Sequence, residues 1–146
     1  MTDGNERKYQ DAAATPLYFR GTYKEAFDLL VEARNYVERH VPAFKYSEDP
    51  PDPVAMTTET LRLTSRLTQV MAWLMAQRAV QEGEIEAADF VDDKYRLEAH
   101  DVCLKRAIDD MDDLPEGLSD LMDRSYELYN RIMRLDMQYV DPKKKN

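Results

Sequence analysis

The sequence predicts an all-α protein: a three-helix up-down-up bundle with a short extra helix and flexible tails, which dimerises. Three observations support this fold class. Charged residues make up 34% of a chain that has only four glycines. The β-branched residues do not gather into the alternating runs that strands require. Three separate stretches repeat apolar residues every three or four positions, as helices with one buried face do. A length of 146 residues suits one domain.

The first helix is expected to begin at Thr22. Residues 1–18 show no periodicity, and we expect them to form a flexible N-terminal tail before a bundle domain of residues 19–137. Thr22 and Glu25 have the spacing of a capping box, in which each side chain bonds the other's backbone amide. Pro42 should end this helix. One stripe contains Tyr23, Ala26, Phe27, Leu30, Ala33, Val37 and Val41.

The second helix is predicted to follow a proline-rich loop. Asp52 supplies an N-cap and Pro53 a first-turn proline. The helix should run to about Glu82 and end at Gly83 in a left-handed conformation.

A short helix is expected over residues 85–94, followed by a connector to Asp113 that we expect to be partly mobile. The last helix should begin at Asp113, which has capping-box spacing to Glu116. Residues 138–146 are expected to form a flexible basic tail. The last helix carries a heptad seam of Leu118, Leu121, Ser125, Leu128, Ile132 and Leu135.

The middle helix is apolar on more sides than a bundle requires. No acid occurs from Leu61 to Gln81, and every residue from Val70 to Ala76 is apolar. A helix that contacts two neighbours needs one apolar arc and leaves a polar arc to water. One stripe in particular is left without a partner: Arg62, Arg66, Gln69, Trp73, Ala76 and Val80.

Two explanations for this stripe are open. Either the 85–94 helix and the connector lie over it, or a second copy or another protein does. Trp beside Ala on an Arg-flanked surface is typical of an interface centre. We therefore take these six residues as candidate interaction residues, and predict a homodimer closed by a two-fold axis.

The charge distribution excludes several classes of partner. A net charge of −9 argues against nucleic acid and anionic lipid. Three arginines and several hydroxyl and amide side chains argue against insertion of the middle helix in a membrane. A polar N-terminus and a single cysteine favour a cytoplasmic protein.

No motif predicts catalysis, and we expect no enzyme, no cofactor and no metal. Neither histidine has the Glu-x-x-His spacing of di-iron bundles. His100 and Cys103 have no second ligand pair for zinc, so an exposed His and a buried or unreactive thiol are expected. The stretch DDMDDLPEG lacks the pattern of a calcium loop.

Three stretches in order resemble the regulator-of-CtrA-degradation (RcdA) family of α-proteobacterial proteins, also filed as a domain of unknown function. They are YKEAFDLLVEARNYV, ETLRLTSRLTQVMAWLMAQRAVQEGEI and LPEGLSDLMDRSYELYNRIMRLD. The resemblance implies a dimeric three-helix bundle that acts as an adaptor for the ClpXP protease. It implies delivery of cell-cycle regulators with a response-regulator partner, and recruitment to a cell pole. The alternative is a helical scaffolding or regulatory protein with another partner.

Overall fold

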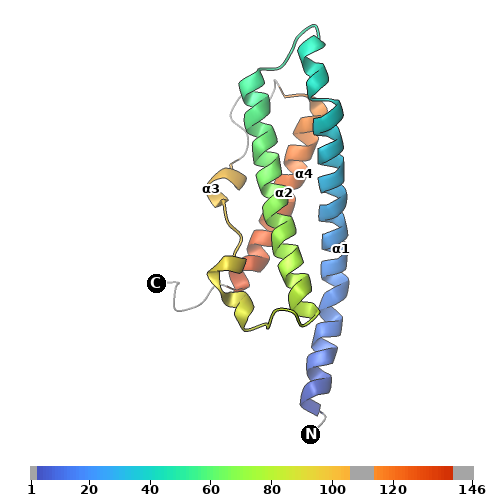
Figure 1. Cartoon of the computed structure of the whole chain (residues 1–146), viewed down its shortest axis with the longest axis vertical. Helices are drawn as coiled ribbons and strands as arrows, with labels where there is room; N and C mark the ends of the chain where they lie inside the picture. The colour runs from blue at the N-terminus through green and yellow to red at the C-terminus, as the bar shows by residue number, and fades with distance from the viewer. Residues whose placement is uncertain (1–2, 106–113, 140–146) are drawn as a thin grey trace.

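The structure, a computed structural model, describes residues 3–105 and 114–139. The prediction of an all-α protein is confirmed, because these ranges contain α-helices and short 3₁₀ helices and no strand. Three long helices, α1 (Asp3–Arg39), α2 (Pro53–Gln81) and α4 (Glu116–Asp136), pack against one another, and the short α3 (His100–Cys103) lies to one side (Figure 1).

The start of α1 corrects the sequence-based prediction. The helix begins at Asp3 and continues through Thr22, so Thr22 lies inside the helix and is not its N-cap. The N-terminal turns extend beyond the ends of α2 and α4 (Figure 1). The division into a flexible tail of residues 1–18 and a domain of residues 19–137 stays a prediction. The end is as predicted, since α1 stops at Arg39 and Pro42 begins the 3₁₀ helix η1 (Pro42–Tyr46).

Both ends of α2 confirm the signals in the sequence. The Asp52 side chain accepts a hydrogen bond from the amide of Val54 at 3.2 Å, and Pro53 occupies the first turn. At the other end Gly83 has φ of +79°, the left-handed conformation that a side chain disfavours. The helix therefore begins and ends where its local chemistry predicts.

The helix directions differ from the predicted up-down-up order. Helix α1 runs antiparallel to both α2 and α4 (Figure 1). The Tyr23 ring lies 5.8 Å from the Arg78 guanidinium near the end of α2. On α4, Arg131 pairs with Glu25 and Arg124 with Glu32, in the reverse order along the two helices. Helices α2 and α4 run parallel, because Arg66 bonds Met122 near the start of α4 and Trp73 bonds Asp136 at its end. The prediction was wrong because the chain after α2 does not turn directly into α4. Residues 82–105 run back along α2, from Gly83 at its end to Val102 beside Arg62, a distance of about 30 Å along the helix (Figure 1).

The connector contains less regular helix than predicted. In place of a helix over residues 85–94 there are two 3₁₀ turns, η2 (Asp89–Val91) and η3 (Asp93–Tyr95), before α3. The acidic stretch expected to be mobile, DDMDD, lies outside the described residues. Asp113, where the last helix was predicted to begin, also lies outside them. In the structure α4 begins at Glu116, with Pro115 at the N-cap position and no side-chain cap.

The core lies between the three long helices. The seam predicted on α4 is buried except for Leu135, which is half-buried. Helices α1 and α4 approach closely at Gly117, where an added Cβ would lie 2.5 Å from a ring carbon of Tyr36. Two ion pairs, Arg124 to Glu32 and Arg131 to Glu25, also join α1 and α4, each at 2.7 Å.

These two ion pairs predict how stability depends on pH. Hydrogen bonds from Arg131 and Arg124 lower the pKa of Glu25 and Glu32 below 4.5. When the pKa of a carboxylate is lower in the folded than in the unfolded state, its ion pair stabilises the fold above the unfolded-state pKa. This stabilisation is lost as the pH falls through the folded-state pKa. Both carboxylates are about half exposed. We therefore expect Glu25→Gln/Glu32→Gln to lose at most about 1 kcal/mol of unfolding free energy near neutral pH.

Urea denaturation at a series of pH values measures this loss, and the difference from wild type should shrink below about pH 4.5. The matched control is Asp28→Asn/Glu38→Gln, whose partners Lys24 and Arg34 lie on the same helix. A pH-independent difference would contradict the assignment.

Candidate functional site

The predicted interaction stripe of α2 points into the molecule. Arg66 is 1% exposed and Trp73 2% exposed, and Arg62 is also buried. The connector and α4 lie over them. Of the two explanations left open by the sequence, the chain's own connector is therefore the one observed, and the interpretation of these side chains as an exposed face is wrong.

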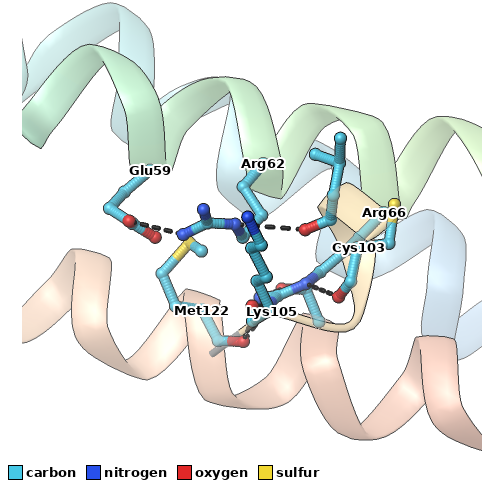
Figure 2. A network of polar contacts seen from close by, with 8 residues as sticks. Glu59, Arg62, Arg66, Cys103, Lys105 and Met122 are labelled. Atoms are coloured by element: carbon cyan, nitrogen blue, oxygen red, sulfur yellow. Dashed lines mark hydrogen bonds and ion pairs between the residues drawn. The ribbon is translucent and has the colours of Figure 1, made fainter. Parts of the chain in front are cut away.

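Arg66 is the centre of the stripe. Its Nε donates to the carbonyl of Cys103 at 2.8 Å, and one Nη donates to the carbonyl of Lys105 at 2.7 Å. The other Nη donates to α4, to the Met122 carbonyl at 2.9 Å and to the Ser125 hydroxyl at 3.2 Å. One guanidinium thus joins α2, the connector and α4 (Figure 2). Burial lowers its pKa, and the neighbouring charge of Arg62 lowers it further.

Arg62 extends the same arrangement by one turn. Its Nε donates to the carbonyl of Val102 at 3.1 Å, and an Nη forms a buried ion pair with Glu59 (Figure 2). Glu59 is the single acid of α2. Because a charge is costly to bury without a partner, this carboxylate balances one of the two buried guanidinium groups.

Gln69 holds the next part of the connector. Its Oε1 accepts a hydrogen bond from the amide of Glu98 at 2.9 Å. From α4, the hydroxyl of Tyr129 donates to the carbonyl of Glu98 at 2.7 Å. Both backbone groups of this residue are therefore bonded by side chains of the long helices.

Trp73 ends the polar part of the stripe. Its indole Nε1 donates to Oδ1 of Asp136 at 2.8 Å, and the backbone amide of Leu97 donates to Oδ2 at 3.0 Å. The Trp73 ring packs edge-on against Phe90 and Tyr139, with centroids 5.8 and 6.2 Å away. Arg96 adds an ion pair to Asp136 at 3.5 Å.

The last two residues of the stripe, Ala76 and Val80, are half-buried against the hydrophobic core. All six predicted residues therefore lie on one side of α2, and the four larger ones bond the connector or α4 directly. Their partner lies in the same chain. This arrangement positions the connector.

Asp136 and Glu59 were not predicted as buried polar residues. A signal for both was present. Asp136 follows Ile132 by four positions and so continues the buried seam of α4, while Glu59 precedes Leu63 by four on α2. A charged residue at a core position indicates a buried polar partner.

The remaining sequence candidates behave as ordinary residues. His100 is exposed and Cys103 is buried, as expected. Within residues 3–105 and 114–139 no three His, Cys, Asp or Glu side chains are grouped as metal ligands. In the same ranges no helix has the length and apolar character needed to cross a bilayer.

Comparison with known proteins identifies a family and a fold. Residues 10–146 match the family DUF1465, described as a protein of unknown function. The crystal structure of RcdA from Caulobacter crescentus CB15 is similar, with a TM-score of 0.62 and 33% identity; the match covers 84% of this chain and 90% of that one. No sequence among the curated proteins matches.

The hydrogen bonds of Arg66 predict the reactivity of Cys103, the single cysteine. Burial raises the pKa of this thiol and shields it, so alkylation should be slow in the wild type. Arg66→Met removes the donor to the carbonyls of Cys103 and Lys105, whereas the Met122 carbonyl still accepts from the Ser125 hydroxyl at 3.0 Å. We expect a loss of roughly 2–5 kcal/mol of unfolding free energy and alkylation at least about tenfold faster, through local release of the connector.

Iodoacetamide labelling followed by mass spectrometry measures the rate. The matched control is Arg78→Met, which removes an exposed arginine paired with Glu82 and should change stability by less than about 1 kcal/mol. Gln69→Ala provides a milder release of the connector, should Arg66→Met not fold. An unchanged labelling rate in both stripe variants would show that these bonds do not hold the connector.

Proposed function

Because the chain belongs to the DUF1465 family and resembles RcdA in fold, we propose that it is a non-enzymatic adaptor that delivers cell-cycle regulatory proteins to the ClpXP protease. The observation that carries this proposal is the 33% identity to RcdA over 84% of the chain. A response-regulator partner, homodimerisation and recruitment to a cell pole are parts of the same proposal.

An adaptor needs a rigid body with separate contact surfaces. Tethering a substrate beside a protease raises its effective concentration without any chemical step. The connector side of this molecule exposes acids from Glu84 to Asp101, whereas the outer face of α2 exposes no charge between Val54 and Gln77. Two surfaces of different character support contacts with two different proteins.

A degradation assay tests the proposal. Purified ClpXP is given a CtrA-type regulator with and without this protein and a response regulator. We expect turnover to rise by at least about tenfold, since tethering gains of this size or larger are common. The adaptor itself should not be consumed.

The control for this assay is the Arg66→Met variant, in which the connector is released and the acidic surface is no longer fixed. Turnover that is unchanged by wild-type protein, combined with tight binding of another partner in a pull-down, would favour the scaffolding alternative.

Dimerisation is tested separately by sedimentation equilibrium. We expect twice the mass of the chain at micromolar concentration, decreasing on dilution as a reversible pair requires. Since the stripe first assigned to self-association is buried, the interface must lie elsewhere. A monomer at all concentrations would contradict this part of the proposal.

A further inference from the structure

A surface helix usually has its charged residues toward water, and α2 has the reverse arrangement. Its charged residues Glu59, Arg62 and Arg66 are buried, and Arg78 is paired with Glu82 at 3.1 Å. Its outward face carries uncharged side chains, with three large apolar ones well exposed. This outer face of α2 consists of Val54, Thr57, Leu61, Thr64, Thr68, Ala72 and Met75.

The exposed apolar residues are regularly spaced. Val54, Leu61 and Met75 are 71%, 62% and 57% exposed. Val54, Leu61 and Met75 are spaced by multiples of seven residues, and Thr68 occupies the position midway between Leu61 and Met75. These side chains are therefore nearly in line along about 30 Å of helix. Phe27 is also exposed and follows Tyr23, the neighbour of Arg78, by one turn of α1. It therefore borders the same face near Met75.

A pocket opens at the N-terminal end of this face. Its volume is 440 Å³, and Thr57, one turn before Leu61, belongs to its lining. The rest of the lining is mainly apolar, and comprises Val41, Phe44, Lys45, Pro50, Pro51, Asp52, Pro53 and Met56. A pocket of this size and character accepts a bulky apolar side chain.

The loop beside the pocket is acidic. Glu48, Asp49 and Asp52 are exposed there, and the Lys45 ammonium lies 4.9 Å from the Tyr46 ring. A partner with basic residues at this position is attracted, whereas two copies of this chain each carry a net charge of −9. The charges thus favour a different protein over a second copy.

We propose that the outer face of α2 binds an amphipathic helix of a partner protein. The helix lies along Val54, Leu61 and Met75 with an uncharged apolar stripe, places a bulky side chain in the pocket, and carries Lys or Arg at the end above residues 48–52. Helix-in-groove recognition uses anchors at this spacing. The inference concerns binding alone and does not depend on delivery to a protease.

The test uses the full chain and a synthetic helical probe. The probe has about six turns, with Leu along one stripe, Phe at one end and three Lys beside the Phe. We expect binding in the micromolar range by fluorescence anisotropy, and amide shift changes confined to α2 and the pocket lining. A probe with Glu in place of Lys should bind several-fold more weakly.

Leu61→Glu and Met75→Glu should each weaken binding by at least about tenfold, because a charge must then be buried. The matched control is Met137→Glu, which introduces the same charge at an apolar residue that is 56% exposed on η5 (Met137–Tyr139) and should bind as wild type. Equal binding by all four proteins would overturn the proposal. A dimer that Leu61→Glu dissociates and Met137→Glu does not would also overturn it, by showing that a second copy covers the face.

Discussion

The parallel arrangement of α2 and α4 depends on hydrogen bonds from α2 side chains to the backbone of the connector. Two long helices that follow one another in the sequence and pack side by side can run parallel only if the chain between them returns along their length. A returning segment with only short helical turns brings backbone carbonyls and amides into the interior, and each needs a partner. Arg62, Arg66 and Gln69 supply these partners to residues 98–105. A guanidinium suits this task because it has five donors and no acceptor.

This constraint explains the unusual composition of α2. Arginines that normally project into water are turned inward to bond the connector, so acids at the same positions would repel its carbonyl oxygens. The single acid, Glu59, neutralises Arg62. The charged side chains Glu59, Arg62 and Arg66 point inward, and the opposite side of the helix has threonine, alanine and exposed apolar residues. The buried polar network and the uncharged outer face thus lie on opposite sides of one helix.

Local signals in the sequence predicted both ends of α2, but the Thr22–Glu25 spacing did not mark the start of α1, which begins at Asp3. Asp52 and Gly83 define the ends of α2 because each acts through its own backbone or that of a near neighbour. The buried seam of α4 was also predicted, from the spacing of its apolar residues. The direction of α4 was not predicted, because it depends on the course of a connector whose sequence shows no clear periodicity. The stripe from Arg62 to Trp73 was correctly identified as needing a partner, but periodicity shows that a face is covered and not which segment covers it.

The two sides of the molecule are suited to contacts of different physical kinds. The connector side exposes acids such as Asp92 and Glu98, and contacts made through such charges are weakened by salt. The outer face of α2 exposes apolar area, and contacts made through apolar burial depend much less on salt. A protein that holds two partners with contacts of these two kinds can release one of them without losing the other. The separation of charge that begins with the buried arginines therefore gives a small helical protein two surfaces of different character.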